Sequence, residues 1–225
     1  MAAAAMQQLK SSDRLLEDNA EFARLHELAL DELQSAIETG ESDSFKNYEG
    51  WKLLRQKGGD TVHQRMNNST PFHDSRTQAQ FDCTLEEYFH AFWHTPEVVA
   101  EFNPNISFSE RIALISEHVQ LIRQKTASRF MISPRELVYV MSYAWIGNSL
   151  YLSIKPVNTL LVPETPNVVR MTVTSFVKVE PVDGASKINA TSFATGLDLK
   201  GNIPHIALRF FMNGSMEMED LESFS

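Results

Sequence analysis

The order of periodic segments in the sequence predicts an α+β fold built on one curved antiparallel sheet of about nine strands. A helical apolar repeat marks residues 13–39, and period-two alternation dominates most of the chain after it. The other helical segments lie in one insertion and at the end, so strands follow one another directly, which favours antiparallel pairing. Because no internal repeat or interdomain linker is visible, we expect one domain over residues 13–225, preceded by a disordered lead-in over residues 1–12.

Local signals mark the bounds of each element. Ser12 or Asp13 is expected to cap the first helix and Gly40 to end it. A helix starting after Thr84 forms the insertion, with a short one after it, and Pro204 is expected near the start of a last helix. The predicted strands cover residues 51–55, 61–66, 77–83, 111–118, 119–126, 135–146, 149–156, 167–180 and 186–198.

Composition excludes several classes of protein. A net charge of −9 and a pI near 5.3 repel nucleic-acid phosphates and anionic headgroups, so we expect no nucleic-acid partner and only transient membrane contact. The single cysteine, Cys83, has no intrachain partner, which suits a reducing compartment. The first residues lack the pattern of a signal peptide, and no apolar run approaches the ~18 residues of a transmembrane helix. The sequence therefore predicts a cytoplasmic protein.

Alternation on two strands separates large from small side chains. In residues 135–146 the odd positions include Tyr139, Met141 and Tyr143, whereas the even positions are smaller. In residues 167–180 the same parity collects Met171 and Val173 on one side. The sheet is thus expected to have one broad apolar face and one mostly polar face. The apolar face fits either a dry core under helices or the wall of a ligand cavity.

Four segments in sequence order resemble the START (StAR-related lipid transfer) domain family, over about residues 46–225. The resemblance implies the helix-grip fold, in which the sheet wraps around a long C-terminal helix and encloses a lipid-sized tunnel. It implies an intracellular lipid-binding and lipid-transfer protein that holds one lipid, with no catalytic residue and no cofactor. The matching segments are Gly50-Trp51-Lys52-Leu53, Ser133-Pro134-Arg135-Glu136-Leu137-Val138-Tyr139, Val168-Val169-Arg170-Met171 and Asp198-Leu199-Lys200-Gly201-Asn202-Ile203-Pro204.

The resemblance also implies where the lipid lies. Family contacts three and five positions after Glu136 correspond to Tyr139 and Met141. Sterol-type members carry an inward carboxylate and arginine where this chain has Ile122 and Met141, so we expect weak sterol binding. The lipid class, phospholipid or other, stays open. The predicted lipid-binding residues are Ile122, Tyr139, Met141, Tyr143, Met171 and Val173 of the sheet with Ile206 and Phe210 of the last helix, and the predicted membrane gate is Phe130 and Leu161.

Other functions have weaker support in the sequence. His90 and His94 are four residues apart on a helix but lack a third ligand, so no metal site is expected. Cys83 has no adjacent base in the sequence and is expected to be inert. A lipid-loaded regulatory sensor, with the acidic residues 217–222 as interaction element, is an alternative function. A helix-grip enzyme of the cyclase type is less favoured, because the predicted inward residues are apolar.

Overall fold

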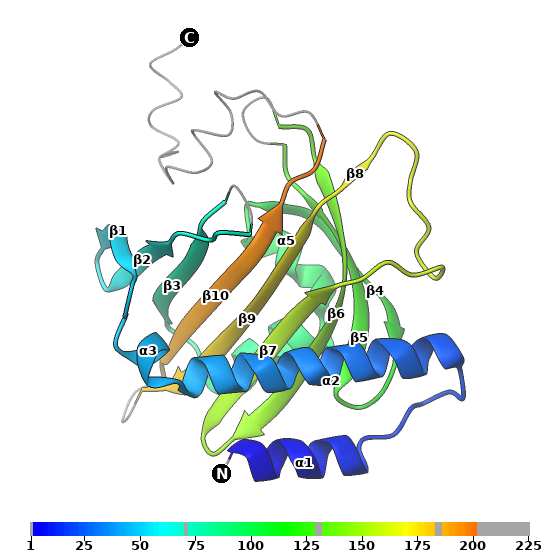
Figure 1. The fold of residues 1–225 in the computed structure, drawn as a ribbon, viewed down its shortest axis with the longest axis horizontal. Helices are drawn as coiled ribbons and strands as arrows, with labels where there is room; N and C mark the ends of the chain where they lie inside the picture. Colours follow the sequence, from blue (N-terminus) through cyan, green and yellow to red (C-terminus); the bar gives the residue numbers. More distant parts are fainter. Residues whose placement is uncertain (1, 70–71, 129–131, 183–185, 202–225) are drawn as a thin grey trace.

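A single ten-stranded sheet organises the computed structural model, which describes residues 2–69, 72–128, 132–182 and 186–201 (Figure 1). The strand order is β1-β2-β3-β10-β9-β7-β6-β5-β4 with antiparallel neighbours throughout, and the short β8 pairs in parallel with β6. The predicted α+β class and antiparallel sheet are confirmed. The strands are β1 (Lys52–Lys57), β2 (Asp60–Arg65), β3 (Asp74–Phe81), β4 (Ile106–Leu114), β5 (Val119–Thr126), β6 (Arg135–Ile146), β7 (Ser149–Pro156), β8 (Val169–Arg170), β9 (Thr172–Pro181) and β10 (Ile188–Asp198).

Helical segments precede the sheet and interrupt it once. The predicted last helix after Pro204 lies outside the described residues. Among the residues that are described, no helix is both long and apolar enough to cross a bilayer. The helices are α1 (Ala2–Ser12), α2 (Ala20–Glu41), α3 (Asp43–Lys46), α4 (Leu85–Phe89) and α5 (Val99–Phe102), with a π-helical turn η1 (His90–His94) and a 3₁₀ turn η2 (Pro96–Val98).

Two predicted strands differ from the structure for reasons of backbone pairing. The predicted strand 167–180 is divided, because β8 turns to pair with β6 while the Met171 amide donates to the Glu136 carbonyl at 2.9 Å. The predicted strand 111–118 begins earlier and ends at Leu114. Residues 115–118 form the turn to β5 instead, closed by a 2.9 Å bond from the Ile115 amide to the Val119 carbonyl.

The face of the sheet expected to be mostly polar is covered by α2, which lies across the front of the sheet in Figure 1. Val138, Val140 and Ala144 of β6 are buried there in one cluster with Leu25 and Leu33 of α2. The expectation was wrong because the small even-numbered side chains of β6 make room for a helix rather than for water. The opposite face, beyond which α5 appears in Figure 1, carries the larger side chains.

The lead-in expected to be disordered is helix α1. Met6 is only 2% exposed and packs in the same core cluster as α2. On the outer surface the Lys10 Nζ lies 2.7 Å from an Asp31 oxygen. One buried side chain and one ion pair to α2 therefore fix a segment whose polar, Ala-rich sequence gave no periodic signal.

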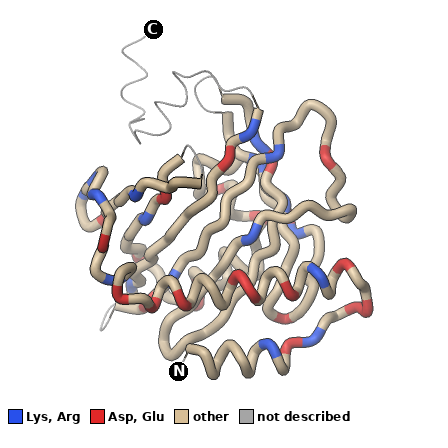
Figure 2. Tube along the Cα trace, in the orientation of Figure 1, with Lys and Arg blue, Asp and Glu red and all other residues tan. Residues whose placement is uncertain are grey.

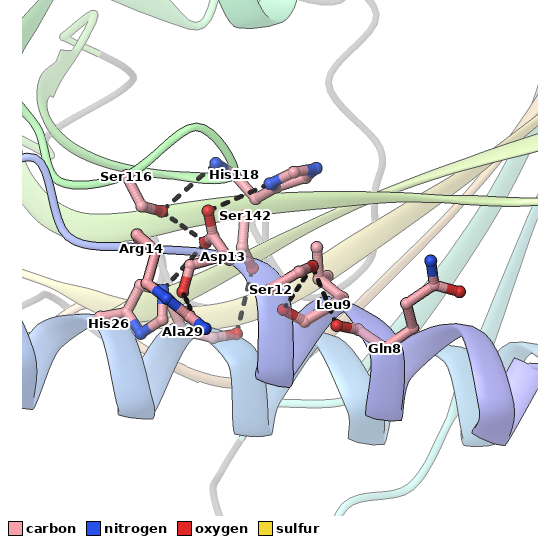
Figure 3. A network of polar contacts seen from close by, with 10 residues as sticks. All are labelled: Gln8, Leu9, Ser12, Asp13, Arg14, His26, Ala29, Ser116, His118 and Ser142. Carbon is pink, nitrogen blue, oxygen red and sulfur yellow. Dashed lines mark hydrogen bonds and ion pairs between the residues drawn. The ribbon is translucent and has the colours of Figure 1, made fainter.

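Helix α2 starts and ends later than predicted. Its N-cap is Asn19, whose side-chain oxygen accepts from the amides of Glu21 and Phe22. Asp13, the expected cap, instead lies in a buried hydrogen-bond cluster (Figure 3). Gly40 is inside the helix, where a Cβ atom would lie 3.0 Å from the Tyr151 ring, so glycine permits close approach of helix and sheet.

The antiparallel order collects several loops at one end of the sheet, here called the upper edge. It is defined by the starts of β1, β3, β4, β6 and β9 and the ends of β2, β5, β7 and β10. The β7–β8 loop and the exit of the chain after Gly201 both lie there (Figure 1).

Candidate functional site

The candidate site is the face of the sheet opposite α2, here called the inner face. Strand register brings predicted lipid-binding residues together on it: Ile122 pairs with Tyr139, and Met141 lies two residues further along β6. With Tyr143 these side chains form one buried cluster, each at most 8% exposed. The structure thus places four of the predicted residues on adjoining strands β5 and β6, on the same side.

A helical cap, residues 85–94, covers one half of the inner face. The cap begins at a capping box in which Thr84 accepts from the Glu87 amide while the Glu87 carboxylate accepts from the Thr84 amide. Its rings then pack on the strand below, with centroid distances to Tyr143 of 4.8 Å for Phe89 and 4.5 Å for Trp93. This half of the face is a packed core.

The rest of the inner face, here called the open half, is less covered. Ile154 of β7 with Val173 and Val177 of β9 are half-buried, in contrast to the buried Tyr139 beside them. Ile154 pairs with Ser175, so a polar group alternates with apolar ones. The open half therefore presents an apolar floor of aliphatic side chains with hydroxyl groups among them.

Apart from Leu161 of the β7–β8 loop, the remaining predicted residues are divided between a second cluster and the undescribed segments. Met171 is buried at the upper edge, and Val173 packs against the cluster there, separate from that of Tyr139. Leu137 contacts both clusters and joins them. Phe130, Ile206 and Phe210 lie outside the described residues. The second cluster is formed by Phe72, Ile132, Met171 and Leu199.

Sequence reasoning missed a polar group beside Met141. Gln120 is fully buried, and its side-chain amide donates to the Trp93 carbonyl at 3.3 Å and approaches the Met141 sulfur at 3.5 Å. Arg111 donates to the Gln120 side-chain oxygen at 3.3 Å and to the His94 carbonyl at 3.3 Å, so it caps the end of η1. The signal was available, since Gln120 shares the parity of Ile122.

Burial keeps the inner tyrosines neutral. Burial raises the pKa of the Tyr139 phenol. Burial, followed by the charges of Glu117 and Asp13, raises the pKa of Tyr143 to about 12. At neutral pH both groups are therefore uncharged, and they add hydrogen-bonding capacity to an otherwise apolar cluster.

Three of the four sequence motifs meet at one junction on the upper edge. The Glu136 carboxylate, 1% exposed, accepts from Arg123 at 2.7 Å and from Arg170 at 2.6 Å. Arg135 donates to the Leu199 carbonyl at 3.0 Å, and a Cβ at Gly201 would contact Val169. The junction fixes β8 and residues 199–201 against β6.

The β7–β8 loop, residues 157–168, is anchored at both ends and exposed at its tip. Arg170 donates to the carbonyls of Val162 and Pro163, and Arg24 of α2 donates to the Asn158 carbonyl at 3.0 Å. Leu160 is 94% exposed and the predicted gate residue Leu161 is 40% exposed. The loop thus presents two neighbouring leucines to solvent at the upper edge.

Within the described part of the chain, His90, His94 and Cys83 supply neither a metal-binding group nor an activated thiol. His90 and His94 both lie in η1 with ring centroids 5.5 Å apart. In the described ranges no group of three or more His, Cys, Asp and Glu side chains could hold a metal ion. Burial, and then the charges of Glu87 and Asp82, raise the pKa of the Cys83 thiol, which disfavours the reactive thiolate.

Comparison with solved structures identifies the fold as that of StAR-related lipid transfer proteins. The structure of human StAR-related lipid transfer protein 5 has a TM-score of 0.73 at 22% identity, covering 86% of this chain and 91% of that one. A StAR-related lipid transfer protein from Xanthomonas axonopodis has a TM-score of 0.64 at 17% identity, covering 73% and 91%. Human STARD10 has a TM-score of 0.63 at 14% identity, covering 94% and 78%.

The family is shown by the sequence itself. The START domain model matches residues 32–219, which is most of the chain, so the chain belongs to the START domain family. A search of curated proteins by sequence gives no significant match.

Proposed function

We propose that this START domain binds a single lipid in an internal hydrophobic tunnel whose floor is the open half of the inner face, and transfers it between intracellular membranes. Membership of the START family supports lipid binding and transfer in general terms. The observation that supports a tunnel on the open half is the difference in side-chain burial between the two halves of the inner face. The helical cap buries Tyr143, whereas Ile154, Val173 and Val177 remain half-buried on the same side of the sheet.

The energy of burying acyl chains explains why such a protein needs no catalyst but needs a membrane. Each buried methylene contributes about 0.8 kcal/mol, so a 16-carbon chain gains on the order of 13 kcal/mol before ordering costs. A lipid held this tightly leaves slowly into water, and exchange requires contact with a bilayer. The neutral Tyr139 and apolar Ile122 offer no acid–base pair on this face, in agreement with carriage rather than chemistry.

The nearest polar groups bear on lipid class. Ile122 and Met141 supply no charge, and the Arg111 guanidinium is engaged by Gln120 and by the carbonyl of His94. Among the described residues of the inner face, a headgroup would therefore meet hydroxyl and amide groups rather than a free cation. This supports binding of a lipid recognised mainly through its chains.

Filling the open half tests lipid binding directly. Val177→Trp is expected to reduce the lipid that co-purifies with the chain at least tenfold, because an indole would occupy the proposed acyl site. Native mass spectrometry with lipid extraction measures the bound fraction. Thr174→Trp is the control, since it places the same ring on the opposite face of β9 from Val177. Equal lipid loading in the two variants, or no lipid in the wild type, would refute the proposal.

The exposed loop tip tests exchange separately from binding. Leu160→Asp and Leu161→Asp are each expected to slow transfer between phosphatidylcholine vesicles several-fold while prebound lipid is retained, because a charge opposes insertion into the bilayer. Leu114→Asp is the matched control, since Leu114 is also 40% exposed but ends β4 at the opposite edge of the sheet. Fluorescent-lipid transfer rates measure the effect. Equal rates in all variants would show that this loop does not enter the membrane.

A further inference from the structure

The β1–β2 hairpin is basic on an acidic chain. Its two strands contain Lys52, Arg55, Lys57 and Arg65 against Asp60, four positive charges less one negative, which gives +3. Helix α2 contains six acidic residues and one arginine, which gives −5, and the whole chain carries −9. In Figure 2 the blue segments of the hairpin lie at the left of the molecule and the red segments of α2 along its lower side. The charge is therefore segregated.

Strand register puts the start of this hairpin at the upper edge. Lys52 pairs with Gln64, Gln64 pairs with Ser75, and Ser75 pairs with Ala194 near the end of β10. The same edge carries the β7–β8 loop with its exposed leucines. Of the hairpin cations, Lys52 and Arg65 thus lie at the edge that the proposed function turns toward a membrane, whereas Lys57 lies at the hairpin turn.

A pocket of about 390 Å³ opens between the hairpin and the start of β3, and cationic groups line it. These cationic groups are Lys52 and Arg65, and the imidazole of His73 also contributes to the wall. Arg65 is held in place by a 2.9 Å ion pair with Asp74 and by stacking 4.7 Å above the Trp51 ring. Within the described part of the chain the buried Nδ1 of His73 has no hydrogen-bond partner. The pocket therefore combines an oriented guanidinium, an ammonium group and an imidazole nitrogen with unused capacity.

Exposed aliphatic side chains adjoin these cations. Met66, at the rim of the pocket, is 75% exposed, and Leu53 and Leu54 of the edge strand β1 are 48% and 38% exposed. Basic groups beside aliphatic ones match a membrane interface, where cations remain among headgroup phosphates and aliphatic groups enter the acyl boundary. A nucleic acid or an acidic peptide would use the cations but would leave the aliphatic groups exposed.

We propose that the β1–β2 hairpin docks the protein on anionic membranes by binding the phosphate of an anionic phospholipid headgroup in the pocket of Lys52, Arg65 and His73. The acidic α2 is repelled by the same surface, so the field orients the molecule with the hairpin toward the bilayer. The docking proposal depends on the proposed lipid-transfer function only for the assumption that the upper edge faces the membrane. It adds that the protein prefers membranes with anionic headgroups.

The test is sedimentation of the full chain with vesicles of phosphatidylcholine alone or mixed with phosphatidylserine. The wild type is expected to bind the mixed vesicles more tightly, with a gain that decreases as salt is raised. The double variant Lys52→Ala, Arg65→Ala, which removes both cations of the pocket, is expected to lose about tenfold in affinity for mixed vesicles and little for neutral ones. The control Lys10→Ala, Lys187→Ala removes the same charge from α1 and from the segment before β10 and is expected to retain the gain.

Three outcomes would overturn the docking proposal. The first is equal binding of the wild type to the two kinds of vesicle, and the second is an equal loss of affinity in the control variant. The third is release of the protein from mixed vesicles by inorganic phosphate at a concentration equal to that of the lipid phosphate, which would indicate a site for free phosphate. The proposed function is judged apart from this. The hairpin variant should co-purify with lipid and transfer it between neutral vesicles as the wild type does. If the wild type neither co-purifies with lipid nor transfers it, lipid carriage is refuted while the docking result is unaffected.

Discussion

Replacement of Glu136 by glutamine is expected to lower the free energy of unfolding by about 3–5 kcal/mol, the largest effect of any single change proposed here. The carboxylate is 1% exposed and accepts from Arg123 and Arg170 on two different strands. Burial alone would raise its pKa, but the bonds from Arg170 and Arg123 outweigh burial and lower the pKa. The amide would remove the charge that lies between the two guanidinium groups, and only the more exposed Glu110 carboxylate, 3.6 Å from Arg123, would remain near them.

Denaturant unfolding at neutral pH measures this loss. Glu110→Gln is the control, because Glu110 also faces Arg123, at 3.6 Å, but its side chain is 38% exposed, and we expect less than about 1 kcal/mol there. Since the junction fixes β8 and the exit of the chain after Gly201, amide exchange in Glu136→Gln should rise first at residues 169–171. A loss below about 1 kcal/mol would contradict the assignment of the junction as a structural centre.

The strands whose bounds were predicted best from the sequence are those in which local residues mark where the strand begins and ends. The bounds predicted for β6 and β7, 135–146 and 149–156, are those observed. Large and small side chains alternate along β6, β7 begins with a short apolar run, and Gly147, with a φ of 61°, supports the tight turn between them. Neither bound depends on a distant partner.

The bounds that were wrong depend on contacts far away in the sequence. Helix α2 starts at Ala20 because Asn19 caps it and because Asp13 is drawn to the β4–β5 turn, more than a hundred residues away. Helix α1 is fixed by the burial of a single Met6. A local pattern contains no information on these distant partners, so local signals alone placed the start of α2 too early and left α1 out of the fold.

The candidate site also contains residues that the local sequence pattern predicted and residues that it missed. Parity on β6 and β9 was enough to group Tyr139 with Met141 and to separate them from the α2 face. Gln120 was missed although it shares the parity of Ile122 on β5, whereas Arg111 was hidden by a register shift between Arg111 and Ala113 that disturbs alternation on β4. The role of the grouped residues in lipid binding stays a prediction until the Val177→Trp variant is measured.

Asp13→Asn is expected to lower the free energy of unfolding by about 2 kcal/mol at neutral pH, and this loss should vanish in acid. The Asp13 carboxylate accepts from Ser116 at 2.6 Å, from His26 at 2.9 Å and from His118 at 3.2 Å (Figure 3). These bonds join the end of α1 to α2 and to the β4–β5 turn. An amide could accept some of them but would lose the charge that strengthens all three.

The pH dependence of this stability contribution follows from the direction in which folding shifts the pKa of Asp13. Burial alone would raise the pKa of Asp13, but hydrogen bonds from His118, Ser116 and His26 together lower it to about 2, against about 3.9 in an unfolded chain. The contribution to stability is therefore complete above about pH 4 and is lost as the pH falls through about 2. Unfolding of wild type and Asp13→Asn in parallel from pH 7 to pH 2 should show the two curves converging, whereas the exposed control Asp18→Asn should follow the wild type throughout. A difference between wild type and Asp13→Asn that stays constant over this range would mean that shape, rather than charge, fixes the cluster.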